Sequence, residues 1–251
     1  MSKITTPAIL CNITPYSESS LIIRAFSFGR GYISIIAKGW RKKAEKEQIL
    51  RFWEYELVLS EPREEGLYIL SEANMLTDYS HYPCLATWAA AECGIELLSQ
   101  LIVPYQEYRH YYTLASEYLK YLSKVEDNAI LIFWRLLERV FVLSGIGRDL
   151  QMCHECGTQA TPYAFDQGSG DVICRACALD RLETGRYLEL SDTASSVLSS
   201  MHSIGNHLND FSLERSQISE INTLYFGYYQ AHQKHKLKLK SMSVLLQLYP
   251  E

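Results

Sequence analysis

Four cysteines in two pairs have the spacing of a metal site. Cys153 and Cys156 form one Cys-x-x-Cys pair, Cys174 and Cys177 form the other, and seventeen residues separate the pairs. Two such pairs at a separation of roughly 15–20 residues are typical of zinc sites. Four thiolates on two tight turns can close a tetrahedron around Zn²⁺. We therefore expect one structural zinc ion per chain.

The same four cysteines argue against catalysis at this site. A catalytic zinc keeps one coordination position open for water, whereas four cysteine ligands leave none. Two alternatives stay open from the residues alone, namely four reduced cysteines without metal and a redox function. The remaining cysteines, Cys11, Cys84 and Cys93, each lie among apolar residues, so we expect all three to be buried.

Positive charge is concentrated at the two ends of the chain. The formal net charge of the 251 residues is -5, but residues 1–51 carry +6, residues 52–231 carry -14 and residues 232–251 carry +3. Such asymmetry indicates a polyanion as partner of the basic ends, with a merely solvated surface as the alternative. Basic side chains in a loop can follow a phosphate backbone without reading its sequence. The predicted nucleic-acid contacts near the N-terminus are Arg24, Arg30, Lys38, Arg41, Lys42, Lys43 and Lys46.

Trp40 lies within this basic stretch and has two interpretations. An exposed indole beside cations can stack on an unpaired base, as in proteins that bind single strands. A buried indole would instead pack at the end of a β-barrel. The residues alone do not decide, and we include Trp40 in the predicted nucleic-acid-binding set. The lysine-rich residues 232–240 are similarly either a second basic patch or the solvated face of a terminal helix.

No arrangement typical of an enzyme is found in the sequence. The glycine-containing turns 29–31 and 168–170 are too short to cradle a phosphate, and His202 and His207 have no Cys or Ser nucleophile nearby. The first residues lack the features of a signal peptide, and no apolar run is long enough to cross a membrane. We therefore expect a cytoplasmic protein that is not an enzyme.

The elements that must position these residues change in type near residue 80. Five short segments rich in Ile, Val, Tyr and Phe predict β-strands, at residues 7–13, 20–28, 32–39, 52–60 and 66–76. Five strands in this length favour a small closed barrel or a sandwich, and the OB-fold is the common five-stranded barrel among nucleic-acid binders. We predict an α+β protein with an OB-fold domain at 1–80 and a helical domain at 81–251.

Helical periodicity dominates the second domain. Predicted helices cover residues 85–102, 107–125, 128–145 and 190–204, and one or two further helices lie within 216–248. The apolar segment 128–145 is expected to be the central, mostly buried helix. The cysteines fall in a zinc ribbon at 150–180, where residues 162–166 and 171–174 predict two short strands joined by a turn.

Three segments together resemble the family of the bacterial DNA repair protein RecO. They are "AILCNITPYSESSLIIRAFSFGRGYISIIAKGWRK" near the start, "WRLLERVFVLSGIGRDLQMCHECG" in the middle and "HKLKLKSMSVL" near the end. The resemblance extends over most of the chain, and its strongest parts are "AKGWRK" and "DLQMCHECG". It implies an N-terminal OB-fold, a helical domain and an inserted zinc ribbon.

The resemblance also implies a function. RecO proteins bind single- and double-stranded DNA, anneal complementary strands and act as recombination mediators in the cytoplasm, at the nucleoid. With RecR as partner they help to load RecA onto DNA coated by the single-stranded DNA-binding protein, whose C-terminal tail they contact. The alternative is a zinc-ribbon regulatory module that binds RNA or protein through the ribbon. Against it, Arg175 is the one basic residue between Cys153 and Cys177, beside the acidic Glu155, Asp166 and Asp171.

Overall fold

The computed structural model describes residues 2–41, 49–62, 66–79, 81–179 and 181–251, and the structural statements below concern these residues. The chain forms two compact units. The first, here called the barrel unit, comprises Met1–Pro83 and Leu98–Lys124. The second, the helical unit, comprises Cys84–Leu97 and Val125–Glu251. None of the described helices is both long enough and apolar enough to cross a membrane.

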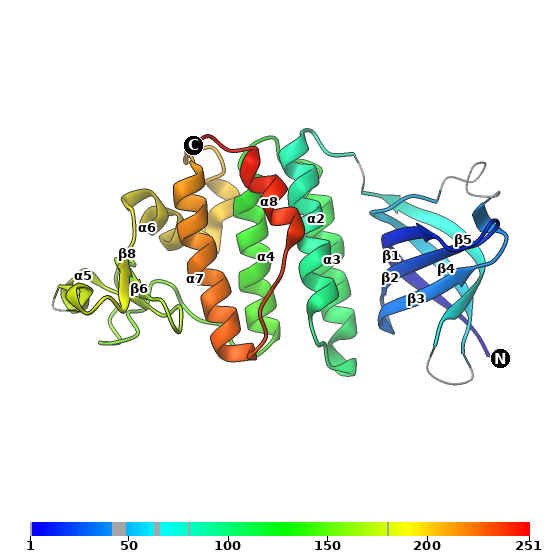
Figure 1. The fold of residues 1–251 in the computed structure, drawn as a ribbon, viewed down its shortest axis with the longest axis horizontal. Coiled ribbons are helices and arrows are strands. Elements are labelled where there is room, and N and C mark those ends of the chain that lie inside the picture. Colours follow the sequence, from blue (N-terminus) through cyan, green and yellow to red (C-terminus); the bar gives the residue numbers. More distant parts are fainter. Residues whose placement is uncertain (1, 42–48, 63–65, 80, 180) are drawn as a thin grey trace. The chain divides into compact units, whose positions relative to one another are not determined.

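Five strands close into a barrel in the first unit (Figure 1). They are β1 (Lys3–Pro15), β2 (Leu21–Ser27), β3 (Gly31–Ala37), β4 (Trp53–Ser60) and β5 (Tyr68–Asp78). The strand order is β1-β2-β3-β5-β4, with β4 pairing back to β1; β3 and β5 run parallel and the other pairs are antiparallel. The predicted α+β class with an N-terminal five-stranded, OB-like barrel is confirmed.

Alternating apolar residues make these segments strands and fill the barrel. In β3 every second residue is buried, because successive side chains of a strand point to opposite faces. The strand β1 contains a bulge at Cys11, where its register with β2 shifts. Arg51 Nε donates a hydrogen bond of 2.9 Å to the carbonyl of Cys11 at this bulge.

One helix beyond residue 80 is part of the barrel unit. The helix α3 (Tyr108–Leu122) follows the short 3₁₀ helix η1 (Tyr105–Glu107) and packs on the barrel. The hydroxyl of Tyr112 donates to the carboxylate of Glu54, which also accepts a hydrogen bond of 2.9 Å from Tyr79. The ring of Tyr112 meets Phe28 edge-on at 5.4 Å. We predicted that all helices belong to the second domain, and its boundary at residue 80 stays a prediction. These contacts join α3 to the strands of the barrel.

The helical unit is built around a central apolar helix. Its helices are α2 (Leu85–Gln100), α4 (Ala129–Leu143), α6 (Asp192–Ser199), η3 (Met201–Asn206), α7 (Arg215–Gln233) and α8 (Lys240–Gln247). The part of α2 after Leu97 belongs to the barrel unit. Nearly all of α4 is buried, as predicted. Trp134 on α4 donates a hydrogen bond of 2.9 Å to Asn222 and stacks on Tyr225, so that α4 and α7 lie side by side (Figure 1).

The cysteine segment forms a small three-stranded sheet. Its elements are β6 (Ala164–Asp166), β7 (Val172–Ile173), β8 (Tyr187–Glu189), α5 (Arg175–Ala178) and η2 (Leu182–Thr184). The order is β7-β6-β8, so the two strands predicted at 162–166 and 171–174 are confirmed and a third strand joins them. Outside this segment, Cys11 and Cys93 are buried as expected, whereas Cys84 is partly exposed, so its predicted burial is wrong.

Candidate metal centre and nucleic-acid interface

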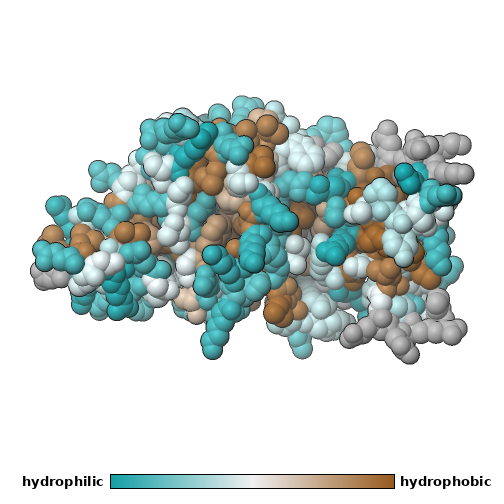
Figure 2. Space-filling model, in the orientation of Figure 1, coloured by the Kyte–Doolittle hydropathy of each residue, from teal (hydrophilic) through white to brown (hydrophobic). Residues whose placement is uncertain are grey.

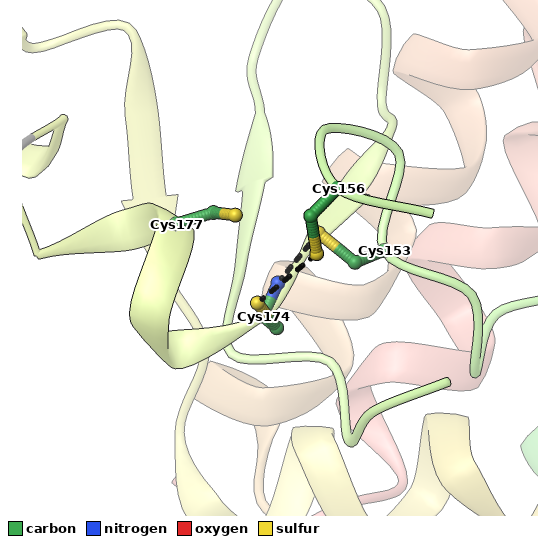
Figure 3. Close-up of side chains that lie close together, drawn as sticks. All are labelled: Cys153, Cys156, Cys174 and Cys177. Atoms are coloured by element: carbon green, nitrogen blue, oxygen red, sulfur yellow. Dashed lines mark hydrogen bonds between the residues drawn. The ribbon is translucent and has the colours of Figure 1, made fainter. Parts of the chain in front are cut away.

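The four predicted cysteines converge on one point (Figure 3). Their sulfur atoms all lie within 4.8 Å of one another, and Cys156 Sγ is 3.9 Å from Cys174 Sγ. A tetrahedral ion with metal–sulfur bonds of about 2.3 Å holds its sulfurs about 3.8 Å apart. The structure therefore brings all four side chains to a geometry that could hold one metal ion.

Two tight turns position the sulfurs. In the first pair, the N–H of Gly157 donates to the carbonyl of Cys153 at 2.9 Å, and Gly157 has a φ of 66°, which costs a glycine little. In the second pair, Cys174 is the N-terminal cap of α5 and its N–H lies 3.3 Å from Cys153 Sγ. Backbone N–H groups that point at sulfur favour the thiolate, which is the form that binds metal.

The thiols differ in acidity. The pKa of Cys156 is lowered to about 6, mainly by the hydrogen bond with Thr158 Oγ1, 2.9 Å away. The pKa of Cys177 is raised to about 12, mainly because its thiol is hydrogen-bonded to Cys156. The lowered pKa of Cys156 favours its thiolate at neutral pH, and an entering cation would displace the proton of a coordinating thiol.

The surroundings fit a structural metal. The sulfurs rest on a small apolar core that includes Ala164, Ile173, Ala178 and Tyr187. Soft thiolate ligands in a tetrahedral set favour zinc among the divalent ions, and four of them leave no open position. His154, a possible competing ligand, is exposed and its Nδ1 lies 3.8 Å from Asp171, outside the sulfur cluster.

The predicted DNA contacts are spread over the barrel rather than gathered in one place. Lys38 and Arg41 are exposed directly beyond the end of β3, where Arg41 donates hydrogen bonds of 3.0 and 3.1 Å to carbonyls of the β1–β2 turn. Arg24 is exposed in the middle of β2. Lys42, Lys43 and Lys46 lie outside the described residues. Residues 38–46 are called the basic segment below.

Arg30 lies at the opposite end of β3 from the basic segment. The seven residues of the strand span about 20 Å. Arg30 also forms an ion pair of 2.6 Å with Glu61, which offsets part of its charge. The guanidinium of Arg109 lies 5.1 Å from the ring of Phe28, two residues before Arg30. Arg109 was not among the predicted contacts, because nothing in the local pattern connects residue 109 with the β2–β3 turn.

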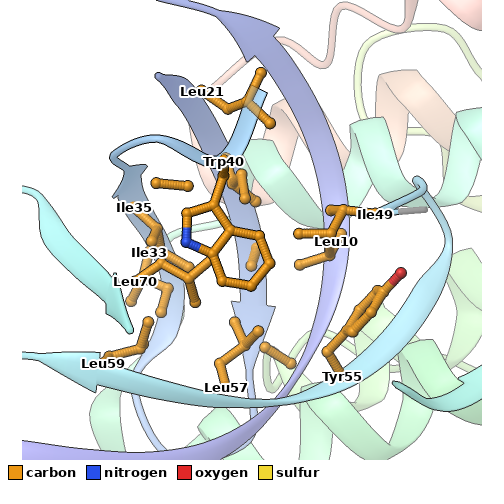
Figure 4. Packing of buried hydrophobic residues seen from close by; sticks show 14 residues of the cluster. Leu10, Leu21, Ile33, Ile35, Trp40, Ile49, Tyr55, Leu57, Leu59 and Leu70 are labelled. Atoms are coloured by element: carbon orange, nitrogen blue, oxygen red, sulfur yellow. The ribbon is translucent and has the colours of Figure 1, made fainter. Parts of the chain in front are cut away.

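The indole of Trp40 is buried. Its side chain is 4% exposed and belongs to the barrel core, packed among residues such as Leu21, Ile35 and Leu57 (Figure 4). Gly39 has a φ of 75°, so the chain turns sharply after β3 and directs the indole inward. The inclusion of Trp40 in the nucleic-acid-binding set is therefore wrong, and the alternative of packing at the barrel end is confirmed.

Comparison with known proteins places this fold in one family. The family model described as "Recombination protein O N terminal" matches residues 1–79, and the model described as "Recombination protein O C terminal" matches residues 84–241.

Individual relatives agree with this match. The chain is 23% identical over 243 residues to the DNA repair protein RecO of Exiguobacterium sp. (strain AT1b), a comparison that covers 96% of this chain and 94% of that protein. It is 25% identical over 205 residues to the protein of that name from Synechococcus sp. (strain JA-3-3Ab), with 76% and 67% covered. A third relative, from Desulfatibacillum aliphaticivorans, is 24% identical over 201 residues, with 71% and 73% covered.

Proposed function

This chain belongs to the RecO family of DNA repair proteins, and from that premise we propose that it is a recombination mediator that acts by binding DNA. In this role it binds single- and double-stranded DNA and anneals complementary strands. With RecR it helps to load RecA onto DNA coated by the single-stranded DNA-binding protein. The proposal includes no catalytic reaction and places the protein in the cytoplasm, at the nucleoid. The match of both family models is the observation that carries it.

The DNA contacts that we propose centre on the basic segment. Lys38 and Arg41 are exposed at one end of a closed barrel, and Lys42, Lys43 and Lys46 follow them in the chain. Arg24 and Arg30 are proposed as peripheral contacts. Contacts of lysine and arginine with phosphates carry no sequence information, so binding is expected to be independent of sequence.

We assign Zn²⁺ a structural role in the ribbon. Support comes from four sulfur donors within 4.8 Å and from the small size of the apolar core beneath them. When bound, the ion supplies no chemistry beyond cross-linking two turns. Cys153, Cys156, Cys174 and Cys177 would hold it.

The alternative, a ribbon that itself binds RNA or protein, has less support. Two arginines close to the ribbon are engaged by its acidic side chains: Arg181 lies 3.1 Å from Glu155, and Arg186 lies 2.5 Å from Asp166. Both cations are thus partly neutralised within the ribbon. A ribbon that contacted phosphates would be expected to present its arginines without acidic partners.

Salt dependence of DNA binding tests the proposed site. The variant K38Q/K42Q/K43Q removes three cations of the basic segment. The logarithm of the association constant K for DNA falls linearly with the logarithm of the salt concentration. Each lost phosphate contact makes this slope less steep by about 0.7 for single strands, so we expect the slope to become less steep by about 2. Fluorescence anisotropy with a labelled oligonucleotide measures it.

A matched control is K120Q/K124Q, which removes two exposed lysines at the end of α3 and should leave the slope unchanged. A parent protein that bound DNA without salt dependence would refute the proposed function. A triple variant with the parent's slope would refute the site alone.

A further inference from the structure

A second lysine-rich segment connects two helices of the helical unit. The helix α7 ends at Gln233, Lys234 takes the left-handed conformation with a φ of 52°, and α8 begins at Lys240. Residues 235–239 between them form neither helix nor strand. The interpretation of these lysines as the solvated face of a terminal helix is therefore wrong. Residues 234–240 are called the lysine connector below.

The backbone of the lysine connector is held in place. Leu237, at its centre, is 6% exposed. At its end, the carboxylate of Glu96 on α2 accepts hydrogen bonds of 2.9 Å from the N–H groups of both Lys240 and Ser241. The hydroxyl of Ser241 also donates to Glu96, at 2.5 Å. The free N–H groups at the start of α8 are thus capped by a side chain from another helix.

The cations of the connector face solvent. It contains four lysines and no acidic residue, and Lys234, His235, Lys236, Lys238 and Lys240 are all exposed. In an extended chain, side chains two residues apart lie on the same side, about 6.6 Å from each other. Figure 2 shows hydrophilic side chains gathered over the end of α7 and the start of this connection. The result is a row of positive charges on a fixed backbone.

We propose that the lysine connector is a second binding surface for the phosphates of nucleic acid, separate from the basic segment of the barrel. The inference rests on the proposed DNA-binding function and adds a surface in the other unit. Of the two leucines between the lysines, Leu237 is buried and Leu239 is partly buried, so the connector presents mainly charged side chains to solvent. This pattern fits a polyphosphate backbone better than an acidic peptide, whose apolar side chains would need a pocket.

Two surfaces in one chain have a functional consequence. Each surface on its own makes few phosphate contacts and binds weakly. When one strand reaches both, the second contact is intramolecular and gains from a high effective concentration. When two strands occupy them, a single molecule holds two strands, which is the requirement for annealing.

The variant K236Q/K238Q tests the proposal in the full-length protein. Leu237 and the Glu96 contacts remain, and a thermal melt establishes that the variant is folded. With a labelled 40-nucleotide single strand, the slope of log K against log salt should fall by about 1.4, that is by about 0.7 for each lysine. K236R/K238R keeps the charge and should keep the parent's slope, while K120Q/K124Q controls for the change in net charge.

The outcomes separate this inference from the proposed function. If the parent and K38Q/K42Q/K43Q behave as expected but K236Q/K238Q keeps the parent's slope, the lysine connector does not contact DNA and the inference is overturned. It is also overturned if K236Q/K238Q loses affinity for poly-glutamate while its DNA binding is unchanged, because the surface then serves an acidic protein segment. A parent that does not bind DNA would refute the proposed function itself.

Discussion

At the scale of single residues, Trp40 shows how burial decides between two roles that a sequence leaves open. Its neighbours in the chain are charged, and the indole nevertheless closes one end of the apolar barrel core. The role of Trp40 is thus to support the backbone from which Lys38 and Arg41 project.

Truncation of this side chain should destabilise the barrel without directly removing a DNA contact. We expect W40A to lower the free energy of unfolding by about 3–5 kcal/mol, the usual cost of removing a large buried side chain. W40F leaves a smaller cavity and should cost less. Chemical denaturation followed by tryptophan and tyrosine fluorescence measures both variants.

DNA binding by W40F separates packing from stacking. Stacking of one base on an aromatic ring contributes about 1–3 kcal/mol, or up to about a hundredfold in affinity. The buried position predicts that folded W40F binds a single strand as tightly as the parent does. A folded W40F with tenfold weaker binding would show that the indole leaves the core to meet DNA.

Residue patterns predicted the cysteine cluster but not the orientation of Trp40 or the contact of Arg109. The cysteine cluster follows from spacing, because two short turns can each deliver two sulfurs with little help from the rest of the chain. The orientation of Trp40 depends on barrel closure and on the turn at Gly39, which no local pattern reports. Arg109 meets Phe28 only because α3 packs on strands that lie about 80 residues earlier in the chain.

At the scale of elements, the ribbon that carries the four cysteines is expected to have little stability of its own. Its strands have three, two and three residues, and its apolar core is small. Elements of this size depend on a cross-link, because the area they bury cannot offset the entropy of ordering the chain. The barrel, in the other unit, has its own core.

Removal of the metal should therefore unfold the ribbon and spare the barrel. With a chelator present, hydrogen exchange measured by mass spectrometry should lose protection in residues 150–180 and keep it in β1–β5. The salt slope of DNA binding should stay that of the parent. The variant C84S, which alters a cysteine outside the cluster, should respond to chelator as the parent does.

The opposite pattern would exclude a purely structural metal. If chelation abolished DNA binding while the barrel kept its protection from exchange, the ion or the ribbon would take part in the interface itself.

Elements were predicted well where the signal was local. All five strands of the barrel follow from alternation between turn residues, and the central helix α4 follows from its long apolar run. The packing of α3 on the barrel was not predictable, since the contact between Tyr112 and Glu54 joins residues 58 positions apart. For the lysine connector, a helix face and a basic patch both stayed open, because lysine is compatible with either conformation and Leu237 and Leu239 fit both periodicities.

At the scale of the whole molecule, the net charge of -5 is a poor guide to its partners. The acidic excess lies in residues 52–231, whereas the basic segment and the lysine connector belong to different units. A strand-annealing mediator needs a surface for each of two strands, and the two basic surfaces that we propose would supply them. The family match and the charge distribution thus lead to the same proposal from separate observations.

Strand annealing on protein-coated DNA tests this account most directly. Complementary strands are coated with the cognate single-stranded DNA-binding protein, and duplex formation is followed by fluorescence quenching. The parent protein should accelerate duplex formation well beyond the spontaneous rate. K38Q/K42Q/K43Q and K236Q/K238Q should each lose most of this acceleration, and K120Q/K124Q should retain it. If the parent left the coated strands to anneal at their spontaneous rate, the assignment as a recombination mediator would be contradicted.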